Sequence, residues 1–299
     1  MGAGISVDRL TMRYGDLVAV DEVGFEVRPG EFFGLLGPNG AGKTTTLEMI
    51  EGLRTPTSGT VTVDGVDPAR RDPLLLRRMG VQLQASSFFE RLTAREQLDT
   101  FRRLYDVDAD RVDAMLDHVG LVDKADVRTE DLSGGQKQRL SIACALVHDP
   151  DVVFLDEPTA ALDPQARRNL WDLLQGLNDS GRTVVLTTHY MDEAEQLCDR
   201  VAIIDHGRIL ELDSPAALIR GLEAPVQISL AHDSLSPADA EQVPAGQVSR
   251  DDGALTITTV EPARVLTWLA ERDALEGLSV KGATLEDVFL DRTGREYRA

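Results

Sequence analysis

Residues 37 to 45, Gly-Pro-Asn-Gly-Ala-Gly-Lys-Thr-Thr, have the residue types and spacing of a loop that binds phosphate groups. Glycines let consecutive backbone N–H groups point toward one anion, and the helix expected after the loop adds the positive end of its dipole. The Lys43 ammonium group would reach the β- and γ-phosphates, and the Thr44 hydroxyl would bind Mg²⁺. The pattern predicts an ATP site made of Gly37, Pro38, Asn39, Gly40, Ala41, Gly42, Lys43, Thr44 and Thr45.

Two carboxylates follow a second apolar strand, Val152–Leu155. At a strand end beside the phosphate loop, Asp156 would hold Mg²⁺, directly or through water. Glu157 would then face the γ-phosphate as the general base for the attacking water. Such a strand end means little alone, because many buried strands end in an acidic turn, but the phosphate loop upstream favours the catalytic interpretation.

His189 follows the strand-like run Val184–Thr188. A histidine at this point can donate a hydrogen bond to the γ-phosphate and orient the attacking water. A lone histidine at a strand end is more often structural. The phosphate loop and the carboxylate pair favour the catalytic interpretation here.

The segment Leu132–Gln136 begins 95 residues after the first glycine of the phosphate loop. The Ser133 hydroxyl, the backbone N–H groups of Gly134 and Gly135, and the N-terminus of a helix over Gln136–Val147 would form a second anion-binding surface. Such a surface can bind the far side of a γ-phosphate that is already held elsewhere. The two sites together predict that a second copy of the protein closes the ATP site.

Six segments together resemble the ATP-binding subunit of an ABC transporter, over about residues 5 to 220. In this family two such domains pack head to tail, and each phosphate loop faces the signature sequence of the partner. The resemblance implies an ATPase that works as a homodimer, because one chain carries both halves of a complete site. The segments are Phe33–Thr45, Gln84, Leu132–Arg139, Val152–Pro158, Ala161–Asp163 and His189.

The resemblance also assigns residues that their types alone do not identify. Tyr14 would stack on adenine, and Asp163 would line the dimer interface. Gln84 would contact Mg²⁺ and sense the membrane partner. Gln82 is the alternative, but Gln84 is preferred because it stands at the end of the apolar strand Met79–Leu83. The predicted metal ligands are Thr44, Gln84 and Asp156, and the predicted catalytic residues are Glu157, His189 and Gln84.

The segments around these motifs alternate strand-like and helical patterns. Phe32–Leu36 leads into the phosphate loop, and Lys43–Leu53 has helical spacing, with Leu47, Ile50 and Leu53 on one face. This alternation predicts an α/β fold, a P-loop ABC-type ATPase with a mainly parallel sheet core. Further strand-like runs are Val152–Leu155, Thr183–Thr187 and Val201–Ile204.

Two smaller parts are expected inside this domain. One is an antiparallel β subdomain. Strand-like runs occur at Ile5–Arg13 and Val23–Val27, and Gly59–Val63 with the turn Asp64-Gly65 suggests another hairpin. A helical insertion is expected at about residues 86–145. Its helices would carry Leu98, Phe101, Leu104 and Tyr105 on one face, and Val112, Met115, Leu116 and Val119 on another.

The pattern changes near residue 220, and two domains are expected: an ABC ATP-binding domain over 1–221 and a small C-terminal α+β accessory domain over 222–299. In the second, Val226–Leu230 and Leu255–Thr259 are expected strands, with a hairpin turn at Asp252-Gly253. Val265, Leu266 and Leu269 would belong to a helix. A short strand near Leu278–Val280 and a helix over Thr284–Leu290 would complete it.

Composition limits the partners. The chain has 299 residues, a formal charge of −20 and 42% hydrophobic residues, which is ample for a core. The acidic surface disfavours sequence-independent binding to nucleic acid or to anionic lipids. No apolar stretch approaches the length of about 18 residues that a membrane span needs. Cys144 and Cys198 lack metal-ligand spacing, which fits a reducing intracellular compartment.

The resemblance places the chain at the cytoplasmic side of the cell membrane, bound through an integral-membrane permease subunit. The insertion, from about Ser86 to Asp131, is where this family meets that subunit. Phe88 and Phe89 would be anchors for it if exposed and ordinary core if buried.

The tail narrows the subfamily. Ala283–Leu290 and Thr293–Arg295 resemble the ending of drug-resistance ABC exporter ATPases, such as those that export anthracycline antibiotics. This implies an exporter of drug-like or lipidic compounds. The rival interpretations are a soluble ABC ATPase acting on a macromolecular complex, and a nucleotide-responsive regulator. The single ATP domain without long coiled coils disfavours the first rival, and intact Glu157 and His189 disfavour the second.

Overall fold

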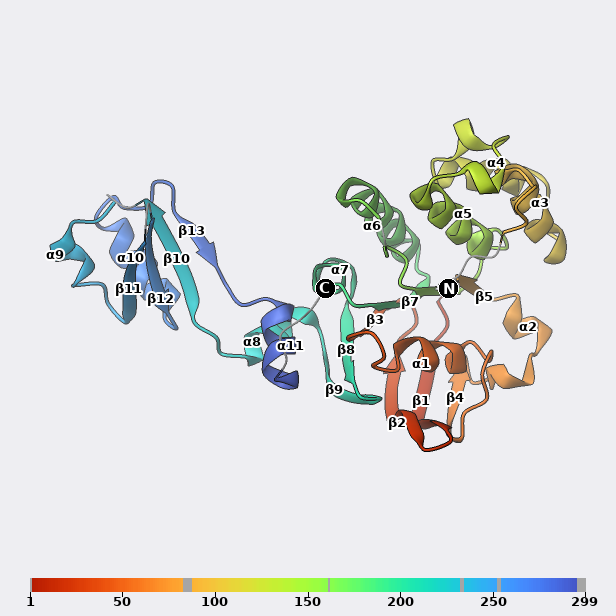
Figure 1. Ribbon diagram of the computed structural model, residues 1–299, viewed down its shortest axis with the longest axis horizontal. Coiled ribbons are helices and arrows are strands. Elements are labelled where there is room, and N and C mark those ends of the chain that lie inside the picture. The colour runs from red at the N-terminus through yellow and green to blue at the C-terminus, as the bar shows by residue number, and fades with distance from the viewer. Residues whose placement is uncertain (1, 83–87, 161, 232–233, 252–253, 295–299) are drawn as a thin grey trace. The chain divides into compact units, whose positions relative to one another are not determined.

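The computed structural model describes residues 2–82, 88–160, 162–231, 234–251 and 254–294 (Figure 1). The chain forms two compact units, Met1–Pro215 and Ala216–Ala299. The division lies at the start of helix α8 (Pro215–Gly221), and the domain boundary expected after residue 221 lies at its end.

A six-stranded sheet forms the centre of the first unit, as the alternating pattern predicts. Five neighbouring strands run parallel, and β9 pairs antiparallel with β8 at one edge. The three central strands are buried at every position, which explains their continuous apolar runs. In spatial order the strands are β5 (Met79–Gln82), β6 (Val152–Asp156), β7 (Thr183–Thr188), β3 (Phe32–Leu36), β8 (Arg200–Asp205) and β9 (Arg208–Asp213).

A three-stranded antiparallel sheet, in the order β2-β1-β4, packs its apolar side chains into the same core. Its strands are β1 (Ile5–Tyr14), β2 (Leu17–Val27) and β4 (Ser58–Val63). The turn expected at Asp64-Gly65 is present, but within the described residues no strand pairs with β4 across it, so the hairpin prediction is wrong. Strand β4 pairs with the distant β1, and beyond the turn only a single bridge joins Val63 to Val66.

The helices of the first unit confirm the expected segments but not all of their faces. Helix α1 stops at Ile50, and Leu53, expected on its buried face, lies beyond it and is 48% exposed. Leu104, expected on the buried face of α3, is 73% exposed. The helices are α1 (Lys43–Ile50), α2 (Pro73–Leu76), α3 (Ala94–Leu104), α4 (Asp110–His118), α5 (Gly134–Leu146), α6 (Pro164–Asp179) and α7 (Met191–Leu197); η1 (Pro68–Arg70), η2 (Val122–Lys124) and η3 (Thr129–Asp131) are short 3₁₀ turns.

Helices α3, α4 and α5 pack on one another and form the helical insertion (Figure 1). Thr93 and Glu96 form a reciprocal capping box at the start of α3, which satisfies two backbone donors. The four residues expected on the apolar face of α4, Val112, Met115, Leu116 and Val119, are all buried. The inward face of α4 is therefore as its spacing predicts.

The second unit contains a four-stranded antiparallel sheet in the order β11-β12-β10-β13, which with its helices makes it α+β. Val265 and Leu269 of α10 are buried against this sheet, as expected. Strand β11 was missed, and the turn expected at Asp252-Gly253 lies outside the described residues. The elements are β10 (Val226–Ala231), α9 (Pro237–Ala240), β11 (Gly246–Asp251), β12 (Ala254–Thr259), α10 (Pro262–Ala270), β13 (Ser279–Lys281) and α11 (Leu285–Thr293).

Candidate active site

The phosphate loop connects the end of β3 to the start of α1, and its glycines are needed for steric reasons. A Cβ atom at Gly37 would lie 2.1 Å from the Ile204 carbonyl oxygen. Gly42 has φ of 102° at the N-cap of α1, and a Cβ there would lie 2.5 Å from the Ala19 carbonyl oxygen. The loop therefore packs its backbone directly against neighbouring backbone.

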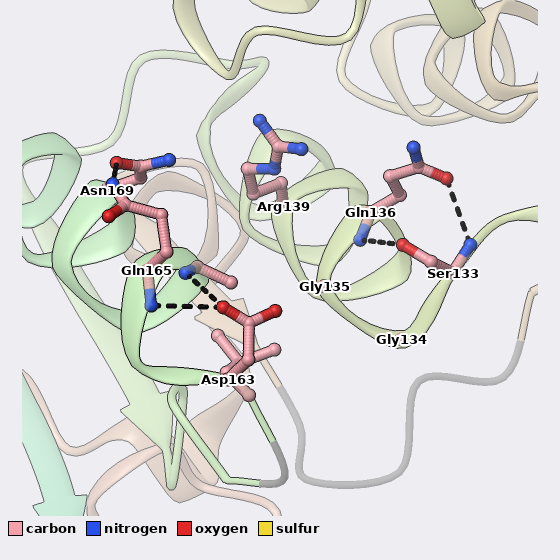
Figure 2. Close-up of a pocket in the computed structure, with 10 residues that line it drawn as sticks. Ser133, Gly134, Gly135, Gln136, Arg139, Asp163, Gln165 and Asn169 are labelled. Atoms are coloured by element: carbon pink, nitrogen blue, oxygen red, sulfur yellow. Dashed lines mark hydrogen bonds between the residues drawn. The ribbon is translucent and has the colours of Figure 1, made fainter.

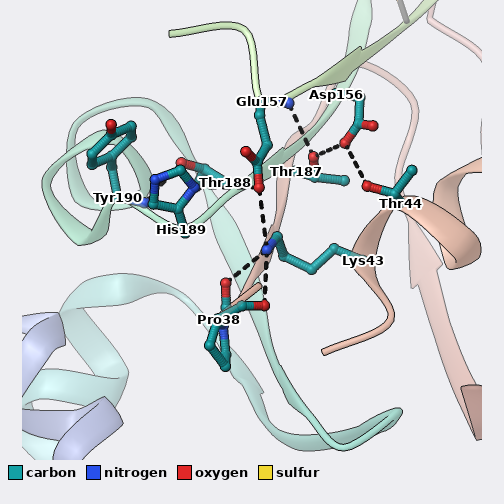
Figure 3. A network of polar contacts seen from close by, with 10 residues as sticks. Pro38, Lys43, Thr44, Asp156, Glu157, Thr187, Thr188, His189 and Tyr190 are labelled. Atoms are coloured by element: carbon teal, nitrogen blue, oxygen red, sulfur yellow. Dashed lines mark hydrogen bonds and ion pairs between the residues drawn. The ribbon is translucent and has the colours of Figure 1, made fainter. Parts of the chain in front are cut away.

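Lys43 is buried in the loop that it follows (Figure 3). Its Nζ donates hydrogen bonds to the carbonyl oxygens of Gly37, at 2.8 Å, and Pro38, at 3.1 Å. The same nitrogen lies 3.3 Å from Oε1 of Glu157. Burial lowers the pKa of Lys43, whereas the Glu157 carboxylate opposes that shift.

Thr44 and Asp156 meet beside the lysine. The Thr44 hydroxyl donates to Oδ1 of Asp156 at 3.1 Å, and the Thr187 hydroxyl donates to the same oxygen. Burial raises the pKa of Asp156, and these two hydroxyl donors oppose the rise. Hydroxyl and carboxylate oxygens suit Mg²⁺, which binds through few protein ligands and the phosphates of its substrate. The donor set therefore fits the metal that the sequence predicts.

Glu157 and His189 come from neighbouring strand ends and face each other (Figure 3). Oε1 of Glu157 lies 3.2 Å from Nδ1 of His189. The Glu157 backbone has φ of 48°, a left-handed conformation that costs a non-glycine residue about 1–3 kcal/mol. Its N–H donates to the Thr187 carbonyl oxygen at 3.1 Å, which holds the residue in that conformation. The fold thus brings Lys43, Glu157 and His189 to one point.

A pocket of about 330 Å³ opens over the phosphate loop. Ala19 of β2 also lines it, a residue that the sequence analysis did not identify. Tyr14, the predicted adenine contact, ends β1 and is 43% exposed, with the Arg54 guanidinium 5.5 Å from its ring centre. It is not among the residues that line the pocket, which are Ala19, Asn39, Gly40, Gly42, Lys43, Thr44, Thr45 and Glu157.

A second pocket, of about 590 Å³, lies over the signature segment (Figure 2). Ser133 caps α5: its hydroxyl accepts from the Gln136 N–H, and its own N–H donates to the Gln136 side chain. Asp163 caps α6 by accepting from the N–H groups of Gln165 and Ala166. Two helix N-termini therefore face one pocket, lined by Ser133, Gly134, Gly135, Gln136, Arg139, Leu162, Asp163, Gln165, Ala166 and Asn169.

The phosphate-loop pocket and the signature pocket share no lining residue. Within one chain, Ser133–Gln136 and Asp163 therefore line a different pocket from that of the phosphate loop. Asp163, which the sequence assigned to a dimer interface, lies beside the signature segment.

The choice between Gln82 and Gln84 stays a prediction. Gln84 lies outside the described residues, and so does Ala161 in the loop before Asp163. Gln82 is the last residue of β5 and is 1% exposed, so its side chain is enclosed in the core. Phe89 is 61% exposed and Phe88 half-buried beside a shallow apolar pocket of about 570 Å³.

Both cysteines are free and buried, and burial raises the pKa of Cys144. No helix in the described part of the chain is long and apolar enough to span a membrane. Within the same residues, no group of three or more His, Cys, Asp and Glu side chains is placed to hold a metal ion.

Comparison with known proteins gives close relatives along the whole chain. A Nod factor export ATP-binding protein I from Cupriavidus metallidurans is 40% identical over 303 residues, covering 100% of both proteins. A protein of the same description from Sinorhizobium fredii is 39% identical and covers 98% of this chain and 87% of its own length. A family model described as ABC transporter matches residues 20–160.

Solved structures show the same similarity to ABC transporter proteins. An ATP-binding subunit of an ABC transporter superimposes with a TM-score of 0.66 at 27% identity, covering 73% of this chain and 92% of its own. A dimeric ATP-binding cassette in a post-hydrolysis state, bound to ADP and Pi, gives 0.65 at 28% identity, covering 70% and 98%. Both similarities extend over more than two thirds of this chain. This protein therefore belongs to the ATP-binding subunits of ABC transporters, ATPases whose hydrolysis of ATP is coupled to transport.

Proposed function

We propose that Lys43, Glu157 and His189 are the reacting centre of the ATPase. The observation that carries this proposal is the position of the Glu157 carboxylate, which contacts both the phosphate-loop lysine and the histidine that follows β7. Water oxygen attacks the γ-phosphorus of ATP, Glu157 accepts the water proton, and the bond to the β-phosphate oxygen breaks to release ADP and phosphate. His189 donates a hydrogen bond to the γ-phosphate and orients the water.

Lys43 has two roles in this scheme. In the described structure its ammonium binds Glu157 and the carbonyl oxygens of Gly37 and Pro38. The phosphates of ATP compete for the same ammonium group. Binding of ATP would therefore remove Lys43 from Glu157 and leave the carboxylate available to accept a proton.

Thr44 and Asp156, with Gln84, are the proposed ligands of Mg²⁺. When bound, the ion supplies positive charge that neutralises the phosphates as charge moves to the leaving oxygen. The hydroxyls of Thr44 and Thr187 both donate to Oδ1 of Asp156 and fix the orientation of its carboxylate. Tyr14 is the proposed stacking partner of adenine.

The ATP site is proposed to close between two copies of this chain. Ser133, Gly134, Gly135 and Gln136 lie over a pocket separate from the phosphate loop, and this pocket also holds Asp163. Exposed backbone donors at a helix N-terminus can bind the γ-phosphate presented by another chain. Because each chain carries both halves, a homodimer would have two equivalent sites.

The transport reaction is proposed to be export of a drug-like or lipidic compound through a separately encoded permease, at the cytoplasmic side of the membrane. Two observations support it: the resemblance of the tail around Ala283–Leu290 to drug-resistance exporters, and full-length relatives that are named for export of Nod factors. Phe89 is the proposed anchor for the permease, because it is an exposed aromatic side chain next to an apolar pocket.

One experiment tests the transporter assignment. Tagged Glu157→Gln protein would be recovered with Mg-ATP from detergent-solubilised native membranes, and its companions identified. A multi-span membrane protein in near-equal amount is the expected companion, and the added change Phe89→Ala should reduce its recovery. Recovery only with ribosomes, with nucleic-acid factors or as a free dimer would instead favour the soluble class of ABC ATPase.

A further inference from the structure

Glu193 is a buried carboxylate that none of the roles above uses. It lies in α7, four residues after His189, and its exposed fraction is 0%. Its Oε1 accepts a hydrogen bond from Nε1 of Trp171 at 3.3 Å. Trp171 belongs to α6, the helix that Asp163 caps. One carboxylate therefore connects the helix after His189 to the helix after Asp163.

The groups around Glu193 come from both strand ends of the active site. Thr188 immediately precedes His189, and Thr159 stands two residues after Glu157. Burial raises the pKa of Glu193 to about 6, and the hydroxyls of Thr188 and Thr159 oppose that rise. The side chain is fully enclosed, with an exposed fraction of 0%.

Aromatic and cationic contacts complete this packed unit. The Tyr190 ring lies 4.1 Å from the His189 ring, and the Arg167 guanidinium of α6 lies 4.1 Å from the Tyr190 ring centre. The Tyr190 N–H donates to the Thr188 hydroxyl at 2.9 Å. The His189 loop is thus held against α6, and Glu193 is the buried carboxyl group in that contact.

We propose that Glu193 is a positioning residue for ATP hydrolysis, which fixes the loops of His189 and Glu157 against α6 and so directs His189 at the γ-phosphate. The inference rests on the proposed role of His189. Glu193 is not among the residues that line the phosphate-loop pocket, so it has no direct contact by which to bind ATP there. Loss of Glu193 should therefore lower kcat and leave KM for ATP almost unchanged.

The test measures steady-state ATPase activity of the full chain in four variants: Glu193→Ala, Glu193→Gln, Trp171→Phe and Glu195→Gln. Glu195 is the matched control, an exposed glutamate on the same helix. We expect kcat to fall about tenfold or more in Glu193→Ala and about threefold in Trp171→Phe, with KM within about twofold. Glu193→Gln keeps the Oε1 acceptor and should restore most of the turnover. Glu195→Gln should match the wild type.

A double-mutant cycle with His189→Ala separates positioning from general destabilisation. If Glu193 acts through His189, adding Glu193→Ala to His189→Ala should lower kcat by less than about twofold further. A full tenfold further loss, or a wild-type kcat in both Glu193→Ala and Trp171→Phe, would overturn the inference. Should His189→Ala itself turn over at the wild-type rate, the proposed role of His189 fails together with this inference. If kcat is low in His189→Ala but equals the wild-type value in both Glu193→Ala and Trp171→Phe, only this inference fails. If Glu193→Ala does not fold, the kcat and KM of Trp171→Phe decide, because that change removes the hydrogen-bond donor to Glu193 and keeps an aromatic ring, although a smaller one.

Discussion

Nζ of Lys43 lies 3.3 Å from Oε1 of Glu157, and both side chains are buried. The lysine that is expected to hold the phosphates of ATP and the carboxylate that is expected to accept a proton from water are therefore paired with each other. Removing one partner of such a buried ion pair destabilises the protein, because the other charge stays enclosed without its partner. The phosphates of ATP offer Lys43 stronger oxygen acceptors, so its ammonium group would exchange Glu157 for the phosphates.

Lys43→Ala should weaken ATP binding and abolish turnover. The change removes the ammonium group that is expected to bind the phosphates, and it leaves Glu157 without its counter-charge. We expect the Kd for ATP to rise at least about tenfold, as for the loss of one charged hydrogen-bond donor. Titration with a fluorescent ATP analogue measures this, with the exposed Lys124→Ala as a charge-matched control. Unchanged affinity in Lys43→Ala would contradict the assignment.

Glu157→Gln should separate binding from hydrolysis. The amide keeps the shape of the side chain but cannot accept the proton of water, so turnover should fall by about 10²–10⁴-fold. ATP binding should persist, and the uncleaved nucleotide should hold two chains together. Size-exclusion chromatography with Mg-ATP would then show a dimer, which should be absent without nucleotide. Turnover close to the wild-type rate would show that another group is the base.

The sequence predicted the parallel strands and the phosphate loop well, because both depend on local patterns. The apolar run that ends in Asp156 is typical of a buried strand. Gly37 is typical of a loop that packs closely against neighbouring backbone. Leu53 and Leu104 were assigned to buried faces because periodicity does not show where a helix ends or what covers it. Strands β9 and β11 were missed because half-exposed strands with charged residues lack a strong alternation.

The residues of the site that sequence reasoning missed have no motif of their own. Ala19 lines the phosphate-loop pocket from β2. The sequence predicts that this strand begins only at Val23, four residues after Ala19. Thr187 is one of two adjacent threonines at the end of β7, and only the packed sheet shows that it bonds Asp156. In the sequence, Glu193 is one of several acidic residues at the start of a polar helix. Its burial depends on α6, which the sequence does not place.

Glu51 gives a prediction about stability. It follows α1 and is 4% exposed; burial, with lesser contributions from Asp156 and Glu48, raises its pKa from 4.5 to about 8. The native state therefore binds the Glu51 proton more tightly than the unfolded chain, and stability falls as pH rises from 4.5 to 8. At pH 7 the cost is about 3 kcal/mol, from 1.36 kcal/mol per pH unit above 4.5.

Glu51→Gln should remove that cost. We expect its free energy of unfolding in urea to exceed that of the wild type by about 3 kcal/mol at pH 7, with little difference at pH 4.5, where Glu51 is protonated in the native protein. The exposed Glu195→Gln serves as the control, and its pH dependence should follow the wild type. An equal gain at both pH values would mean that the carboxyl is not protonated by burial.

The proposed ATP site between two copies of the chain gives the sharpest test of the dimer. Gly134 has nothing within 4 Å of the place where a Cβ would stand, so Gly134→Asp should fold normally. Its carboxylate should repel the γ-phosphate of the partner chain and abolish turnover. Lys43→Ala is inactive for the opposite reason, because its phosphate loop fails while its signature segment is intact. Thermal melting of each variant alone checks that both are folded.

Mixing the two inactive variants should restore activity. In an equal mixture about half of the dimers are mixed, and each has one site that combines an intact phosphate loop with an intact signature segment. With independent sites, the mixture should regain about a quarter of the wild-type turnover, against almost none for either variant alone. Recovery should appear only at concentrations that allow chains to exchange. A mixture as inactive as its components would mean that the sites do not combine across two chains, or that one competent site cannot turn over while the other is blocked. A mixture of wild type with Glu157→Gln separates these cases, because each mixed dimer has one intact site beside a site that binds ATP without hydrolysing it.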